Sequence, residues 1–154
     1  MKSNQLPKSL HILLADDDRD DRFFFDKALK ALSVPTHLTT VKDGVKLMEY
    51  LFENSNKLPD ILFLDLNMPR KNGSECLIEI KSNKALKSLP VIIYSTSLYG
   101  NVSDLLYEKG AHYYVRKTDF DELKKNLSRV FSLIVEKKPT RPSRAEFIIS
   151  LEGV

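Results

Sequence analysis

The sequence has little cysteine: Cys76 is the only one in 154 residues. No internal disulfide can form, and no zinc site can be built from cysteine ligands. The sequence also lacks any apolar run near the roughly 20 residues that a helix needs to cross a bilayer. Residues 1–8 are polar and lack the apolar core of a signal peptide, so we expect a cytoplasmic protein.

Strong net charge is absent too, since lysine and arginine exceed aspartate and glutamate by only three. The charge is unevenly placed: acids crowd residues 16–21, and bases crowd residues 137–144. A basic tail can bind nucleic acid, but no aromatic is interleaved with these bases before Phe147 and no helix-turn-helix pattern follows. We therefore interpret it as a solvated tail and expect neither nucleic acid nor a membrane as a partner.

Apolar runs of strand length alternate with stretches of helical periodicity. Five such pairs follow one another, which predicts a parallel sheet covered by helices on both faces. With right-handed crossovers this is a doubly wound α/β domain, which we place at residues 9–138 between a lead, 1–8, and a linker with an apolar tail, 139–154. The expected strands are residues 10–15, 36–41, 61–64, 91–94 and 112–115, and the helices cover 18–33, 45–52, a segment from Gly73, 102–106 and 123–134.

Chemically capable side chains gather where the predicted strands end. Asp16 and Asp17 follow the first strand, Asp65 the third, Ser95 the fourth and Lys117 the fifth. In an open parallel sheet, ligands bind outside the carboxyl ends, where the strand order reverses. If these strands are neighbours, the five residues meet in one crevice.

Such a crevice favours phosphoryl chemistry. Three carboxylates repel one another unless a cation compensates, and Mg²⁺ is the usual hard cation beside phosphate. A carboxylate such as Asp65 can act as a nucleophile and form an acyl phosphate. Lys117 and the metal would then stabilise charge on the phosphoryl oxygens, and the Ser95 hydroxyl can hydrogen-bond one of them.

Several spaced motifs carry a resemblance to a known family. Residues 64–69 (LDLNMP), followed by Gly73, look like the phosphorylation loop of response-regulator receiver domains. Residues 12–18, 91–95 and 110–117 resemble the acidic first strand, the switch-hydroxyl strand and the fifth-strand region of that family. The match covers roughly residues 9–136 and implies a flavodoxin-like, CheY-like sheet with strand order 2-1-3-4-5.

The resemblance implies a metal and phosphoacceptor site. Asp65 would be the phosphoacceptor, and Asp17 would bind Mg²⁺ directly, with Mn²⁺ as an alternative. Asp16 would contribute directly or through water, and the backbone carbonyl of Asn67 would complete the protein ligands. In this family the side chains at Asn67 and Ser97 tune the hydrolysis rate.

The resemblance also implies a switch. Ser95 and Tyr114 would form a pair in which the hydroxyl moves toward the phosphoryl group and the ring turns inward, and Lys117 would contact the phosphoryl group. One departure is Thr118, because receivers usually carry proline after this lysine. Thr96 follows Ser95, so a one-residue slip would exchange the two hydroxyls, and we favour Ser95.

Three further acids have a simpler explanation. Asp18, Asp20 and Asp21 begin a predicted helix, where negative charge is stabilised by the helix dipole. We interpret them as a solvated helix start.

The C-terminal tail contains apolar side chains that are costly to leave in water: Phe147, Ile148, Ile149 and Leu151. We hypothesise that it packs on its own domain, on a second subunit or on the kinase.

The implied function is that of a single-domain response regulator in two-component signalling. It would take a phosphoryl group from a sensor histidine kinase and catalyse only that transfer and its slow reversal. Residues 20–24 and 69–73 most resemble small stand-alone receivers that partner phytochrome-type kinases. Other expected partners are a downstream protein or phosphotransfer protein and a second copy of the chain.

Two rival hypotheses belong to other classes. A receiver-like interaction module that works without phosphorylation would not need the acids and lysine. A haloacid-dehalogenase-type phosphatase would need an acid two residues after the nucleophile, where this chain has Asn67.

Overall fold

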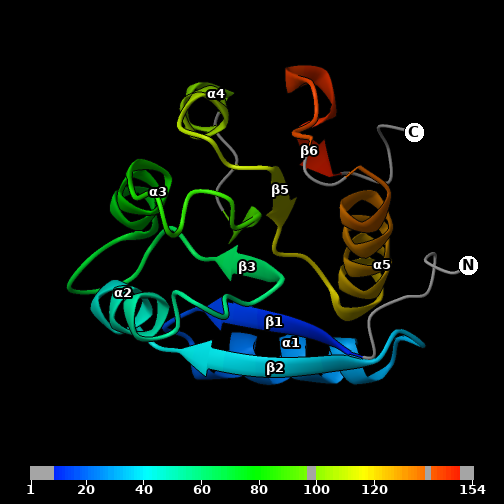
Figure 1. Ribbon diagram of the computed structural model, residues 1–154. Coiled ribbons are helices and arrows are strands. Elements are labelled where there is room, and N and C mark those ends of the chain that lie inside the picture. The colour runs from blue at the N-terminus through cyan, green and yellow to red at the C-terminus, as the bar shows by residue number, and fades with distance from the viewer. Residues whose placement is uncertain (1–8, 97–99, 138–139, 150–154) are drawn as a thin grey trace, which may run out of the picture.

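A computed structural model describes residues 9–96, 100–137 and 140–149. Strands and helices alternate from the first strand to the last long helix (Figure 1). The strands are β1 Leu10–Ala15, β2 Thr36–Val41, β3 Ile61–Leu64, β4 Val91–Ser95, β5 Tyr113–Arg116 and β6 Ile148–Ile149. The helices are α1 Arg19–Lys30, α2 Gly44–Glu53, α3 Gly73–Ser82, α4 Gly100–Glu108, α5 Phe120–Lys137 and a 3₁₀ turn, η1, at Arg144–Glu146.

The strands form one sheet in the order β2-β1-β3-β4-β5-β6, and every neighbouring pair is parallel. The flavodoxin-like class and the order of the first five strands are therefore confirmed. The expected count of five is corrected to six. The extra strand, β6, comes from the segment that the sequence analysis treated as a tail, and it pairs Ile149 with Val115.

Each face of the sheet carries its own hydrophobic core. Residues of α1 and α5 pack on one face, against side chains such as Ile12 and Phe63. Residues of α2, α3 and α4 pack on the other, against side chains such as Leu13 and Leu62. Successive strand residues point to opposite faces, and here both faces are covered, which explains why the central strand β3 is a continuous, fully buried apolar run.

Side chains fix where the helices begin near the carboxyl edge of the sheet. Asp18 caps α1 by accepting a hydrogen bond from the Asp21 backbone N–H at 2.9 Å. At α3, Asn72 and Glu75 form a reciprocal capping box. Gly73 follows at the first helical position, where a Cβ would lie 2.2 Å from the carbonyl oxygen of Asp65.

The segment after α5 lies along β5 and α4 (Figure 1). Phe147 is fully buried in the same core as Tyr114. Arg141 donates hydrogen bonds to the carbonyls of Tyr107 and Ala111, and Arg144 donates to Asp104. The interpretation of these two arginines as a solvated tail is therefore wrong, because backbone carbonyls and a carboxylate engage them.

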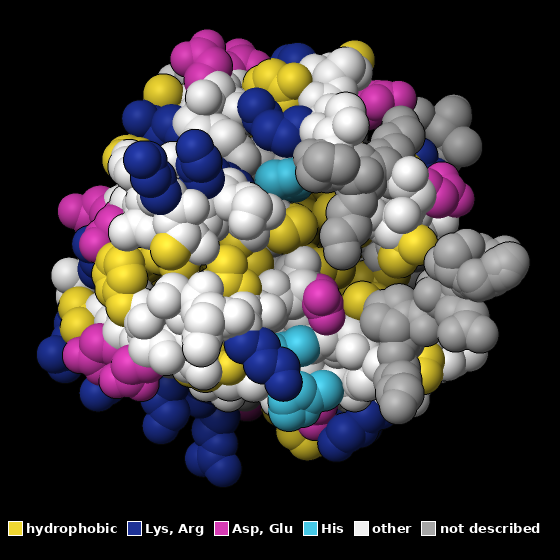
Figure 2. Space-filling model, in the orientation of Figure 1, with side chains coloured by type: hydrophobic (Ala, Val, Ile, Leu, Met, Phe, Trp, Pro, Cys, Tyr) yellow, Lys and Arg dark blue, Asp and Glu magenta, His cyan; other side chains and the backbone are white. Residues whose placement is uncertain are grey.

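Within the described residues, no helix is long and apolar enough to cross a membrane. Figure 2 shows that hydrophobic side chains line a hollow near the middle of one face, and that lysine and arginine side chains gather over α3.

Candidate functional site

Backbone hydrogen bonds bring the strand ends of β1 and β3 together. The backbone N–H of Asp65 donates to the carbonyl of Ala15 at 2.9 Å, so Asp65 lies beside the residue that precedes Asp16. On the other side, the backbone N–H of Lys117 donates to the carbonyl of Ser95 at 2.9 Å. The strand adjacency assumed from the sequence is therefore present, and we call the place where these strand ends meet the acidic crevice.

Three carboxylates gather in this crevice. Asp16, Asp17 and Asp65 each offer an oxygen atom within 4.8 Å of the others. Asp16 and Asp65 are buried, whereas Asp17 is exposed, so the cluster opens to solvent on the Asp17 side. An all-oxygen, anionic donor set of this kind fits a hard divalent cation.

Asp16 is the most heavily engaged of the three acids. Its Oδ1 accepts a hydrogen bond from the Asp18 backbone N–H at 2.9 Å, and its Oδ2 lies 2.9 Å from the Lys117 ammonium. Oδ1 is therefore hydrogen-bonded, whereas the buried Oδ2 is ion-paired with Lys117 but accepts no hydrogen bond.

Lys117 supplies the positive charge of the crevice. Its Nζ lies 2.9 Å from Asp16, 2.8 Å from Asp21 and 3.6 Å from Asp65, and its side chain is only 10% exposed. The ammonium also lies 5.2 Å from the ring centroid of Tyr94. The threonine that follows the lysine, in place of the usual proline, does not prevent this placement.

Burial and charge shift the titration of the site. Burial raises the pKa of Asp65 to about 6, the Lys117 ammonium opposes the shift, and the Asp16 carboxylate adds to it. Burial also raises the pKa of Asp16. Burial alone lowers the pKa of Lys117, but the neighbouring carboxylates of Asp21 and Asp16 outweigh it, so the net shift is upward and the lysine is cationic.

The two residues predicted as a switch lie on neighbouring strands. Ser95 ends β4 and is fully buried, whereas Thr96 is exposed, which favours Ser95 as the inward hydroxyl. The Tyr114 ring is also fully buried, so it lies inward in this structure. Burial raises the pKa of Tyr114, and the Ser95 side chain opposes that shift.

The residues predicted to tune hydrolysis differ in what can be said of them. Asn67 is exposed, and its backbone N–H points to Oδ1 of Asp65 at a long 3.5 Å. Ser97 lies outside the described residues. The roles of both stay predictions.

Sequence reasoning missed Asp21. Asp18 is the helix cap and Asp20 is exposed, as a solvated helix start requires, but Asp21 reaches Lys117. A signal was present, because Asp21 stands three residues after the cap and helical side chains tilt back toward the N-terminus. The sequence alone does not show where Lys117 lies, so it could not identify the residue that the Asp21 side chain contacts.

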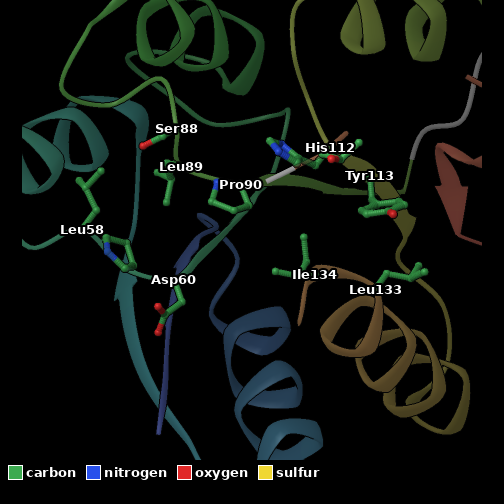
Figure 3. A pocket seen from close by; sticks show the side chains of 11 residues that line it. Leu58, Asp60, Ser88, Leu89, Pro90, His112, Tyr113, Leu133 and Ile134 are labelled. Atoms are coloured by element: carbon green, nitrogen blue, oxygen red, sulfur yellow. The ribbon is translucent and has the colours of Figure 1, made fainter. Parts of the chain in front are cut away.

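A separate pocket of about 280 Å³ lies at the opposite, amino ends of β3, β4 and β5. Figure 3 shows Leu58 and Leu89 on one side of it and Leu133 and Ile134 of α5 on the other. Burial lowers the pKa of the lining His112 to about 4, so this histidine is neutral. The pocket shares no residue with the acidic crevice.

The model of the response regulator receiver domain matches residues 12–128. The chain belongs to the response regulator receiver family. Its place in two-component signalling follows from that membership, and a receiver that works only as a phosphorylation-independent module is not favoured.

Individual response regulators are similar to this chain in sequence and in structure. This receiver is 34% identical to the response regulator Rcp1 of Synechocystis over 80% of this chain and 82% of Rcp1. The phosphorylated cyanobacterial phytochrome response regulator RcpA has a TM-score of 0.73 and 33% identity, covering 88% of this chain and 99% of RcpA. The Mn²⁺-bound form of Rcp1 has a TM-score of 0.73 and 32% identity, covering 87% and 99%.

Proposed function

We propose that Asp65 of this receiver accepts a phosphoryl group from a sensor histidine kinase in a Mg²⁺-dependent reaction. The observation that carries the proposal is the position of Asp65. This carboxylate is 5% exposed, belongs to the three-acid cluster and lies 3.6 Å from a lysine ammonium. A nucleophile, a cation site and a fixed positive charge are therefore combined in one crevice.

The transfer involves one bond made and one broken. A carboxylate oxygen of Asp65 attacks phosphorus, the bond from phosphorus to the kinase histidine nitrogen breaks, and that nitrogen keeps the electron pair. The product is an acyl phosphate on Asp65. Lys117 donates a hydrogen bond to a phosphoryl oxygen, and the Ser95 hydroxyl donates to another.

Asp17 and Asp65 would hold the cation directly, Asp16 directly or through water, and the Asn67 carbonyl would complete the set. When bound, Mg²⁺, or Mn²⁺ in its place, would offset the negative charge on the attacking carboxylate and the phosphoryl oxygens. The receiver's own chemistry is then limited to this transfer and to slow dephosphorylation, at a rate tuned by Asn67 and Ser97.

The phosphoryl group would act as a population switch. Ser95 and Tyr114 belong to neighbouring strands, β4 and β5, so a shift of the hydroxyl alters the packing of the ring. We propose a phytochrome-type kinase as the donor, because RcpA, at 33% identity, is a cyanobacterial phytochrome response regulator. A downstream protein or a phosphotransfer protein would read the switch, and a second copy of this chain is a further candidate.

The test is intact mass after incubation with acetyl phosphate, with and without Mg²⁺. We expect one phosphoryl adduct on the wild type in Mg²⁺, none in chelator, and none on Asp65→Asn. Asp20→Asn is the matched control, since it removes an exposed carboxylate near the site, and it should take the adduct. An adduct on Asp65→Asn, or none on the wild type even from a phosphorylated kinase, would refute the proposal.

A further inference from the structure

The ammonium of Lys117 has three N–H donors and lies close to three carboxylates. It donates a hydrogen bond to Asp21 at 2.8 Å and forms an ion pair with Asp16 at 2.9 Å. The carboxylate of Asp65 lies farther away, at 3.6 Å. A third N–H can therefore serve an oxygen on a group attached to the Asp65 carboxylate.

Asp21 reaches the lysine because α1 begins where it does. Its backbone N–H is held by the cap residue Asp18, which fixes it in the first turn of α1. Its side chain crosses to a residue 96 positions later, at the end of β5, and keeps 35% of its surface exposed. This contact joins the start of α1 to the end of β5.

Asp21 also differs from the other two acids around Lys117 in what else it does. Asp16 and Asp65 belong to the three-acid cluster, so a bound cation would share their charge. Asp21 is not a member of that cluster. Among the described residues that pair with Lys117, it is the one whose carboxylate can stay with the lysine while a cation occupies the other acids.

We propose that Asp21 is a positioning residue for phosphoryl transfer: with Asp16, it orients Lys117 so that the third N–H points at a phosphoryl oxygen on Asp65. The inference rests on the proposed function of Asp65. Charge-assisted hydrogen bonds are strong and short, and a small misplacement of a group that acts in the transition state slows a reaction markedly.

Asp21 could instead act through its charge, by repelling the incoming phosphoryl group. The two effects have opposite signs. Asparagine keeps an oxygen acceptor but removes the charge, whereas alanine removes both. Positioning predicts that the rate falls from wild type to Asp21→Asn and falls further in Asp21→Ala, while repulsion predicts that both variants are faster than the wild type.

The first measurement is the rate of adduct formation from acetyl phosphate in saturating Mg²⁺. We expect Asp21→Ala to be about tenfold slower than the wild type, with Asp21→Asn in between. Asp20→Ala, which removes an exposed carboxylate from the same turn of α1, should match the wild type within about twofold. An Asp21→Ala rate equal to or above that of the wild type would overturn the inference.

A second measurement asks whether the effect passes through the lysine. In a Lys117→Ala background, removing Asp21 should change the remaining rate by less than about twofold, because its partner is gone. If Asp21→Ala slows the reaction as much without Lys117 as with it, Asp21 does not work by orienting the lysine, and the inference fails.

A third measurement needs neither metal nor phosphoryl group. The Lys117 amine is acetylated briefly in chelator and quantified by peptide mass spectrometry. We expect several-fold faster modification in Asp21→Ala, intermediate modification in Asp21→Asn and wild-type behaviour in Asp20→Ala. Unchanged modification in Asp21→Ala would contradict the contact. This readout separates the two proposals, since it holds even if the wild type takes no phosphoryl group.

Discussion

The ring of Phe147 lies edge-on to the ring of Tyr114, with centroids 6.3 Å apart and planes at 80°. Phe147 also contacts Tyr107 of α4, at 5.3 Å between ring centroids. Phe147 and Tyr114 are fully buried. The segment after α5 therefore completes a core next to the residue predicted to switch.

Phe147→Ala should lower the free energy of unfolding by about 3–5 kcal/mol, the usual loss when a buried phenylalanine is truncated. Urea denaturation would measure it. Phe52→Ala is the matched control, because Phe52 is 44% exposed on α2 and should cost far less. Equal losses in the two variants would mean that the segment does not pack as described.

Gly73→Ala should damage the site and the fold together. A Cβ at this position would lie 2.2 Å from the carbonyl oxygen of Asp65, so the phosphorylation loop or the start of α3 must shift. Overpacking of this kind costs about 1–3 kcal/mol. We expect lower stability in urea and slower adduct formation from acetyl phosphate. Ser74→Ala, one position along α3, should affect neither, and a fully active Gly73→Ala would contradict the close approach.

Stability without metal should depend on pH through Asp65. Its pKa is about 6 in the folded protein against 3.8 for an ordinary aspartate, so the folded state binds a proton more tightly. Its contribution to stability is then fully present below about pH 3.8 and is lost as pH rises through about 6. At 1.36 kcal/mol per pKa unit the loss would be about 3 kcal/mol, and screening by solvent makes it smaller.

Urea denaturation in chelator between pH 4 and 8 would measure that dependence. The Asp65→Asn variant lacks the titrating group, so the difference in unfolding free energy between it and the wild type should change across this window. Parallel curves for the two proteins would show that the pKa of Asp65 is not raised.

We expect the phosphoryl donor to dock on the surface of α1 that carries two exposed aromatic rings. Phe23 is 57% exposed and Phe24 is 49% exposed, and Phe24 follows Asp21, the partner of Lys117, by three residues in α1. Exposed apolar side chains beside a reactive site are typical of a partner surface.

Replacing both rings with alanine should slow transfer from a phosphorylated histidine kinase about tenfold or more, as expected when aromatic anchors are lost. Labelling by acetyl phosphate, which needs no docking surface, should stay at the wild-type rate. Phe52→Ala on the opposite face is the control. If kinase transfer is unchanged, the donor docks elsewhere.

The acidic crevice could be predicted from the sequence because its aspartates directly follow apolar runs of strand length. The run from Leu10 to Ala15 ends in Asp16 and Asp17, and the run from Ile61 to Leu64 ends in Asp65. Parallel pairing places such ends at one edge, so a local pattern determines a long-range site. The covering of both faces followed from the same pattern, whereas the strand order came from the resemblance to receiver domains.

Asp21 and the sixth strand were decided by tertiary structure. Asp21 has the local surroundings of a helix start, and it pairs with Lys117 only because the fold brings together two residues 96 positions apart. β6 is two residues long, too short for any periodicity to predict, and it forms because Phe147 fills the core beside Tyr114 while Arg141 holds the carbonyls at the end of α4. Patterns along the chain determine which faces of the strands and helices are buried. Contacts between residues far apart in the sequence depend on how these elements pack in the folded protein.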